Sequence, residues 1–273
     1  MRRSVGVQMI VVMGLGCVVI SGCATGVIAK HPDFKSRQAR IHAMTILPPK
    51  IDVYKLAFNG DRQEMYDLLA PITSEATEEL QTTLTNRGYN IRVLNLNDDA
   101  LRESPELKRS LQTIRDVFNT RISEYQKRWF PAFRQFTYSL GSEVNIVADH
   151  TKSDALVIVQ CTGLKKTGGE ITKDITQSAL IFAATLGSVL VINHASATVI
   201  QLAVVDGDTG DILWYADNSE DATFDIADEP RFRGVLRNMM SQFPNAIAQR
   251  AATTPLPSRP ISRHPTVPSP TAP

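Results

Sequence analysis

The order of apolar runs and amphipathic stretches after residue 40 constrains the fold more than any other feature of the chain. Apolar runs at 43–47, 91–94 and 155–161 predict three strands. Apolar residues spaced three and four positions apart predict helices over about 69–87 and 105–125. Strands that alternate with helices pair in parallel, so this order predicts an α/β fold with three parallel strands and helices packed on the sheet.

Turn and capping residues mark where some of these elements begin and end. Ser104 directly before Pro105 is typical of a helix start, because serine caps free backbone amides and proline fits the first helical position. Ile51 and Val53 continue the apolar pattern of the first strand. We therefore expect that strand to extend beyond the two prolines that follow its first run.

A hairpin signal lies in the second half of the chain, in VVDGDTGDILWYAD (residues 204–217). Two apolar runs, 197–205 and 212–215, flank a loop that is rich in glycine and aspartate. These runs predict an antiparallel C-terminal hairpin. The chain should therefore form a mixed sheet of about five strands.

The loop of this hairpin has three possible interpretations. Calcium loops space carboxylates at alternate positions, as Asp206 and Asp208 do, but they end with a glutamate at position twelve, where this chain has Asp217. The pattern D-x-x-TG-x-x-x-W also occurs in quinoprotein propeller blades, which repeat it many times, whereas this chain has it once. The third interpretation, a turn that binds no metal, is the one we predict.

An apolar stretch from residue 175 to residue 192 precedes the hairpin. It contains ALIFAATLGSVLVI, which does not alternate between apolar and polar residues as a membrane β-hairpin would. Its length falls short of the ~20 residues that a spanning helix needs. We therefore expect a mostly helical segment that is covered by the domain or by a partner, with Leu186 and Val189 as candidate partner-binding residues.

The N-terminus carries the pattern of a bacterial lipoprotein signal. Arg2 and Arg3 form a basic start, an apolar run follows, and the stretch ends on ISGC at Cys23. A cysteine after small residues is the site that lipoprotein signal peptidase exposes for acylation. The alternative, a retained membrane-spanning anchor, is disfavoured because the apolar run is short of ~20 residues. Ala24, rather than aspartate, after the cysteine favours the periplasmic face of the outer membrane.

These features divide the chain into four parts. They are a signal peptide (1–22), a tether (23–40), a periplasmic α/β domain (41–250) and a tail (251–273). The tail is dense in proline and serine, so it cannot bury enough apolar surface to fold, and we expect it to be extended and disordered. The alternative for the tail is a proline-rich ligand for a partner.

Charge and cysteine usage exclude several classes of protein. The formal net charge is +1, and loss of Arg2 and Arg3 with the signal peptide lowers it by two. A domain that binds nucleic acid carries a basic stripe, so we expect no nucleic-acid partner. With Cys23 acylated, Cys161 is left without a disulfide partner, and its apolar run ALVIVQC predicts a buried and unreactive thiol.

Enzyme motifs are missing or incomplete. Lys166, Thr167 and Gly168 match the third box of penicillin-binding enzymes, but no Ser-x-x-Lys supplies a nucleophile. The chain has no Walker loop, no Rossmann glycine pattern, no C-x-x-C and no H-E-x-x-H, and its histidines have no ligand spacing. The sequence predicts neither an enzyme nor a bound cofactor or metal.

An aromatic-rich insert follows the second helix. It contains Trp129, Phe130, Phe133, Phe136 and Tyr138. Aromatic residues carry much of the burial in any domain, which favours a core role. An exposed platform for a partner is the alternative, with Trp129 and Phe133 as its candidate residues.

Several of these motifs together resemble a known group of proteins. The lipobox, a first strand ending in ILPP, SDALVIVQCTG and ATVIQLAVVDGDTGDILWYAD are similar to small outer-membrane lipoproteins with the fold of the TolB amino-terminal domain. That group is related to the curli-secretion lipoprotein and to lipoprotein activators of penicillin-binding proteins. The aromatic insert and the proline-rich tail depart from its pattern.

The resemblance implies a function without naming a catalytic residue. It implies a lipid on Cys23 and a periplasmic interaction module that assists assembly or regulation of a cell-envelope complex. Its partner would be an envelope protein or a second copy of the chain. The alternative is a subunit of an outer-membrane secretion pore, like the curli-secretion relative.

Overall fold

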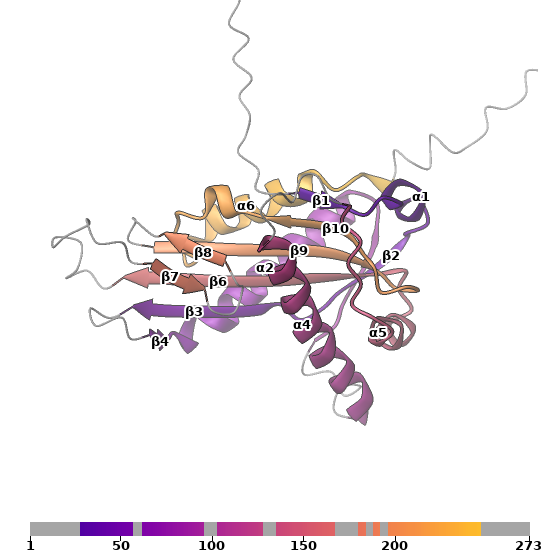
Figure 1. The fold of residues 1–273 in the computed structure, drawn as a ribbon, viewed down its shortest axis with the longest axis horizontal. Helices are drawn as coiled ribbons and strands as arrows, with labels where there is room; N and C mark the ends of the chain where they lie inside the picture. The colour runs from indigo at the N-terminus through magenta and orange to yellow at the C-terminus, as the bar shows by residue number, and fades with distance from the viewer. Residues whose placement is uncertain are drawn as a thin grey trace, which may run out of the picture.

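The computed structural model describes residues 28–56, 62–95, 103–127, 135–166 and 196–246, together with two short strands at 180–183 and 188–191. The described chain forms one mixed eight-stranded sheet with helices on both faces (Figure 1). The sheet strands are β1 (Ile28–Lys30), β2 (Ala43–Ile46), β3 (Lys50–Leu56), β4 (Arg62–Glu64), β5 (Asn90–Val93), β6 (Ala155–Lys166), β9 (Ser196–Asp206) and β10 (Ile212–Asp217). The mixed α/β class is therefore confirmed, but the sheet has eight strands rather than five.

The strand order combines a parallel half with an antiparallel half. The path runs β1-β10-β9-β6-β2-β5, and β3 pairs with both β6 and β4. β2 pairs in parallel with β5 and β6, whereas β9 pairs antiparallel with β6 and β10. The predicted parallel strands and the C-terminal hairpin are both present.

Three strands account for the difference in number. Residues 43–56 are not one long strand but two, β2 and β3, which pair with successive parts of β6. The prolines between them cannot donate a ladder hydrogen bond, so the chain breaks there. β1 and β4 have three residues each, which is too short to show an apolar period, and β4 is also entirely polar.

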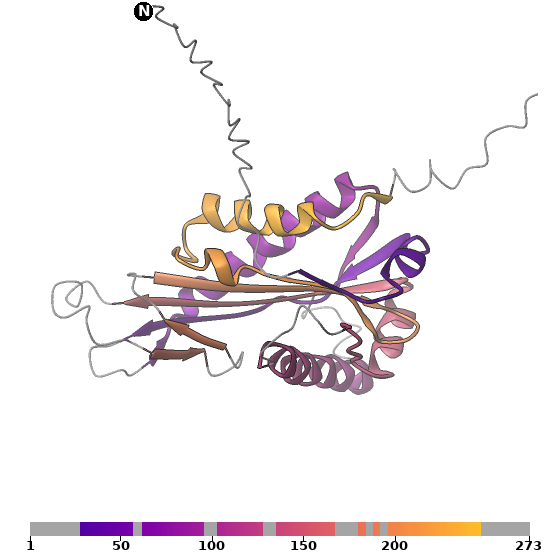
Figure 2. The same cartoon turned by 45° about the horizontal axis from the view of Figure 1, so that its top comes forward.

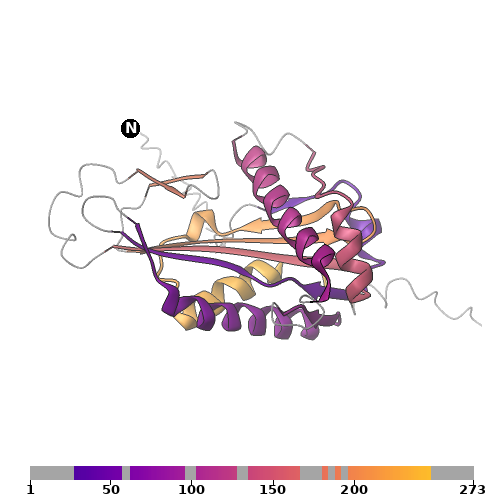
Figure 3. The same cartoon turned by 90° about the horizontal axis from the view of Figure 1, so that it is seen from below.

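Four longer helices form two layers. α2 (Leu69–Asn86) and α6 (Glu229–Ser241) cover one face of the sheet, and α4 (Pro105–Gln126) and α5 (Glu143–Thr151) cover the other (Figures 2 and 3). The short elements are α1 (Phe34–Gln38) and the 3₁₀ turns η1 (Tyr66–Leu68) and η3 (Ser219–Asp221). No helix in the described ranges is both long and apolar enough to cross a bilayer.

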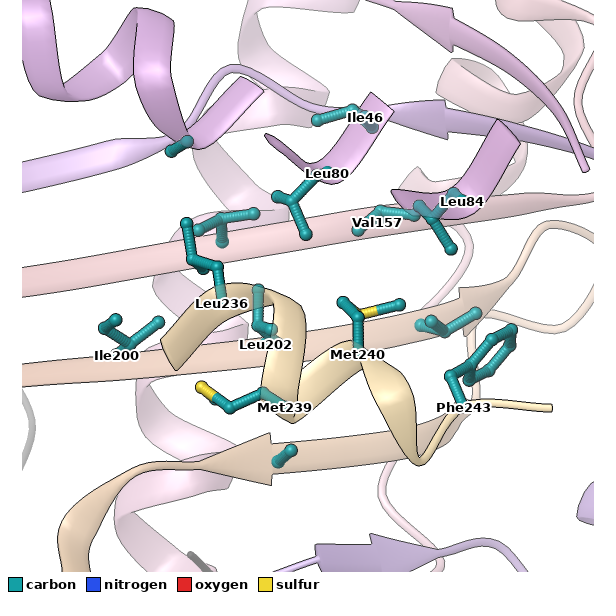
Figure 4. Packing of buried hydrophobic residues seen from close by; sticks show 14 of the residues in the cluster. Ile46, Leu80, Leu84, Val157, Ile200, Leu202, Leu236, Met239, Met240 and Phe243 are labelled. Atoms are coloured by element: carbon teal, nitrogen blue, oxygen red, sulfur yellow. The ribbon is translucent and has the colours of Figure 1, made fainter. Parts of the chain in front are cut away.

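The core under α2 and α6 follows the predicted helical spacing. Leu80 and Leu84 of α2 are fully buried against Val157 of β6, and Leu236 and Met240 reach the same core from α6 (Figure 4). The labelled side chains come from α2, α6, β2, β6 and β9, and Phe243 follows the end of α6. The predicted helix over 69–87 is therefore confirmed.

The core on the other face follows the predicted stripe of α4. Its buried apolar residues are Leu107, Leu111, Ile114, Phe118, Ile122 and Tyr125. At the start of α4 the Ser104 hydroxyl accepts a hydrogen bond from the Leu107 amide at 3.2 Å, which is the predicted N-cap. The sequence therefore predicted both the spacing of the buried residues of α4 and the residue at which the helix begins.

Residues 28–40 correct the expected tether. β1 pairs with β10 at three positions, and Phe34 of α1 is buried in the core. This part of the chain belongs to the fold, so the domain begins before residue 41. Cys23, the residues before Ile28 and the tail after Ala246 lie outside the described residues.

The expected helix over 175–192 is also wrong where the structure describes it. Residues Leu180–Ala183 (β7) and Ser188–Val191 (β8) are antiparallel strands that pair with each other. Phe, Ile and Val favour strands, and two runs of four residues are too short to show a clear period. Val189 lies in β8, whereas Leu186 lies outside the described residues.

Candidate functional site

The acidic turn between β9 and β10 is closed by an arginine from α1. Arg37 Nε donates to Asp206 Oδ2 at 3.0 Å, and Arg37 Nη1 donates to Asp211 Oδ2 at 2.8 Å. Arg37 Nη2 also donates to the hydroxyl of Thr209. Arg37 is 9% exposed and Asp206 is 7% exposed. The positive charge of the arginine and the negative charge of the carboxylate therefore form a buried ion pair.

The electrostatics of this cluster follow from the contacts. Burial is the largest single effect on Asp211 and opposes its ionisation, but the hydrogen bonds from Arg37 and Thr209 and the charge of Arg37 together outweigh it and hold the pKa of that carboxyl below its ordinary value. Burial likewise opposes the charge of Arg37, yet its hydrogen bonds to Asp211 and Asp206 hold the arginine pKa above its ordinary value. Both groups are therefore charged at neutral pH.

The backbone of the turn uses the remaining acceptor of Asp206. Its Oδ1 accepts the amides of Asp208 at 3.0 Å and Thr209 at 3.1 Å. Gly210 has φ +72°, and a Cβ there would lie 2.3 Å from the carbonyl oxygen of Gly141. These contacts confirm the predicted hairpin turn. Its buried carboxylate, Asp206, and its partly exposed carboxylate, Asp211, both pair with Arg37 of the same chain.

The turn also holds three other segments together. The Leu140 amide donates to the Gly210 carbonyl at 2.8 Å, and the Gly207 amide donates to the Asp154 carbonyl at 2.8 Å. The Asp154 carboxylate accepts the backbone amide of Ala43 at 2.9 Å. What looked most like a ligand site in the sequence is therefore a structural junction.

A second cluster, which the sequence analysis missed, is a row of polar residues across the sheet under α4. Gln160 of β6 pairs in register with Gln201 of β9, which pairs with Asp217 of β10. Their exposed fractions are 4%, 0% and 2%. We call Gln160, Gln201 and Asp217 the polar row. Its sequence signal was a glutamine inside each of two mainly apolar runs, 155–161 and 197–205.

The polar row is only partly satisfied. Gln160 Nε2 donates to Asn119 Oδ1 of α4 at 2.6 Å, and Asp217 Oδ2 accepts the Tyr215 hydroxyl at 3.0 Å. The oxygen of Gln160 and both amide atoms of Gln201 have no partner in the described structure. Burial and the neighbouring Asp217 carboxylate raise the pKa of Tyr215 well above its ordinary value, so this hydroxyl remains a donor.

Aromatic residues close the end of this layer. Tyr125 of α4 lies 5.1 Å from Phe136 and 5.9 Å from Tyr215 between ring centroids, in edge-to-face arrangements. Phe136 and Tyr138 are buried, so the core interpretation of the aromatic insert is confirmed for these two residues. The partner-binding candidates Trp129 and Phe133 lie outside the described residues.

This face also has a groove, and the opposite face of β6 carries the one cysteine of the described residues. A polar groove of about 350 Å³ lies between α4 and the extended segment after the insert. It is lined by Arg121, Glu124, Gln135, Thr137, Tyr138 and Ser139. Cys161 is buried, and burial raises the pKa of its thiol, as expected of an unreactive cysteine.

Comparisons with known proteins add little to this geometry. No protein-family model matches the chain, and no curated protein matches it in sequence. The PelC dodecamer structure from Paraburkholderia phytofirmans has 9% identity, covers 80% of this chain and 94% of its own, and has a TM-score of 0.33. The LpoB C-terminal domain from Salmonella enterica has 12% identity, covers 69% of this chain and 93% of its own, and has a TM-score of 0.26.

A third similar structure is lipoprotein GNA1162 from Neisseria meningitidis. It has 12% identity, covers 78% of this chain and 99% of its own, and has a TM-score of 0.30. At such scores these likenesses carry no argument about function. The resemblance to TolB-like lipoproteins stays a prediction, and function is argued from the chain itself.

Proposed function

We propose that this chain is a lipid-anchored interaction module on the periplasmic face of the outer membrane, assisting assembly or regulation of a cell-envelope complex. It acts by contact and carries out no catalysis. The observation that carries the proposal is the β7–β8 hairpin, whose strands pair with each other and, within the described residues, with no strand of the main sheet. The hairpin overlaps β6 and β9 in Figure 1, but Figures 2 and 3 show it apart from the main sheet, on the side that carries α4.

The sequence of the hairpin explains why it needs a partner. LIFA and SVLV are apolar at seven of eight positions, at odd and even positions alike. Successive strand residues belong to opposite faces, so this sequence predicts two apolar faces. The domain can cover one face, and a second apolar face in water is typical of a contact site.

The acidic turn supports a role in binding rather than catalysis. Asp206 is held by Arg37 and by two backbone amides, and Asp211 is paired with Arg37, so these carboxylates are engaged within the fold rather than presented to a substrate or metal. An anchor on Cys23 would then keep the hairpin at the membrane. The partner is an envelope protein or a second copy of the chain.

Charge substitutions in the hairpin test this proposal. Leu186→Asp and Val189→Asp should abolish cross-linked assemblies in envelopes while the protein stays in the membrane fraction. Asn90→Asp is the matched control, because it adds the same charge on the exposed edge of β5. Normal assembly of both hairpin variants would overturn the proposal.

A pore subunit is the second candidate, and one observation favours it. The stretch that we expected to be helical is strand at β7 and β8, and β-hairpins from several copies can close into a barrel. Against it, barrel strands need about 9–11 residues with alternating polarity. Ion conduction by the purified protein in bilayers, abolished by Val189→Asp, would favour the pore over the interaction module.

A further inference from the structure

The fold begins only five residues after the cysteine that we propose to be acylated. Ile28, the first residue of β1, is paired with Ala216 of β10. A fully extended chain spans at most about 3.6 Å per residue, so Ile28 lies within ~18 Å of Cys23. Since the lipid holds Cys23 at the bilayer surface, β1 must lie close to that surface. This step depends on the proposed lipidation of Cys23.

The N-terminal segment cannot easily be peeled away to lengthen this connection. The His31 amide donates to the Leu213 carbonyl at 2.9 Å, directly after β1. Phe34 is 5% exposed and lies 6.0 Å from the Phe243 ring, centroid to centroid. Arg37 then attaches α1 to the acidic turn. The first described residue of the chain thus belongs to a segment that is fixed to the rest of the domain.

The sheet topology places the attachment at one edge of the domain. β1 is the first strand of the path and β5 the last, with four strands between them. β1, β10, β9 and β6 lie side by side in this order (Figure 1). Neighbouring strands are about 4.8 Å apart, so β5 lies ~24 Å from β1 across the sheet.

We propose that the domain stands on the membrane with its β1 edge facing the lipid head groups and its β5 edge facing away. The bilayer therefore covers the surface around β1, and a protein partner must bind to another side of the sheet. A long tether would let the domain sample both orientations, but five residues do not. The short connection makes the domain a membrane-proximal module.

Single introduced cysteines can measure this orientation in the full-length lipidated protein. Lys30 on β1 and Asn90 on β5 are both exposed, and each can be replaced by cysteine and labelled with a fluorophore. Buried Cys161 and acylated Cys23 would not react with the label. The protein is reconstituted in phosphatidylethanolamine–phosphatidylglycerol vesicles with a quencher on the lipid head groups.

The Lys30→Cys probe should be quenched several-fold more than the Asn90→Cys probe. A ten-residue Gly-Ser insertion after Val27 should remove most of this difference, because it frees the domain from the surface. Equal quenching at both sites, or a difference that survives the insertion, would overturn the inference while leaving lipid anchoring intact. Failure of the protein with native Cys23 to bind vesicles at all would instead refute the anchoring proposal and this inference with it.

Discussion

Replacing Arg37 by methionine tests the central structural claim about the acidic turn. Methionine keeps most of the apolar stem of the arginine but removes its charge. Asp206 Oδ2, 3.0 Å from Arg37 Nε, and Asp211 Oδ2, 2.8 Å from Arg37 Nη1, would then lose their cation. Breaking a buried ion pair costs ~3–5 kcal/mol because it leaves an uncompensated charge. Asp206 keeps two backbone amide donors, so we expect about 3 kcal/mol, at the lower end of that range.

The loss is measured by urea unfolding of a soluble Cys23→Ser form at pH 7. For a domain of this size 3 kcal/mol corresponds to a melting temperature lowered by about 6–12 °C. Arg37→Met combined with Asp206→Asn should recover part of the loss, because the stranded charge is removed as well. A loss below about 0.5 kcal/mol, the level of an ordinary surface change, would refute the reasoning.

The same variant should change how stability depends on pH. Arg37 holds the folded-state pKa of Asp211 below its ordinary value of 3.8. A depressed carboxyl pKa stabilises the fold above the unfolded value, and this contribution is lost as the pH falls through the folded value. The native protein should therefore lose stability below about pH 4 more steeply than Arg37→Met. Parallel curves for the two proteins would contradict this assignment.

Three further outcomes are expected. Cys23→Ser should release the protein from outer membranes and abolish incorporation of labelled lipid, and a variant that still floats with membranes would show that the lipid is not the anchor. Trp214→Ala should lower the free energy of unfolding, measured with urea, by ~3–5 kcal/mol, because the side chain is fully buried. Asp208→Ala, at an exposed position of the turn, should lower it little. Similar losses for both variants would contradict the burial of Trp214. Gln201→Leu should leave stability unchanged or raise it by ~1–3 kcal/mol, because it removes two unpartnered buried atoms, and a clear loss would reveal an ordered water or ligand at the polar row.

The elements predicted best were those whose period was repeated many times. α2 and α4 each bury an apolar residue every three or four positions over several turns, and the hairpin at 197–215 joins two apolar runs through a glycine-containing turn. Such patterns are local, so the sequence alone reveals them. β1 and β4 are too short to show a period, and their pairing depends on distant strands.

The site could be predicted only in outline, because its contacts are non-local. Asp206 stood out in the sequence as part of an aspartate-rich loop, but its partner Arg37 lies 169 positions away along the chain. Gln160 and Gln201 become neighbours only through the register of β6 and β9. The prediction of a helix over 175–192 was wrong for another reason, because short apolar runs fit a buried strand and a helix equally well.

The attachment of α1 to the acidic turn determines how a pulling force on the N-terminal end is transmitted through the molecule. Any pull on the N-terminal end of the described chain enters β1 and is carried first by its three-residue ladder with β10. If the hydrogen bonds between β1 and β10 break, the force is carried next by the contacts of Arg37 with the turn of the β9–β10 hairpin. Two attachments in series therefore secure the N-terminal end of the described chain, and both connect it to the β9–β10 hairpin.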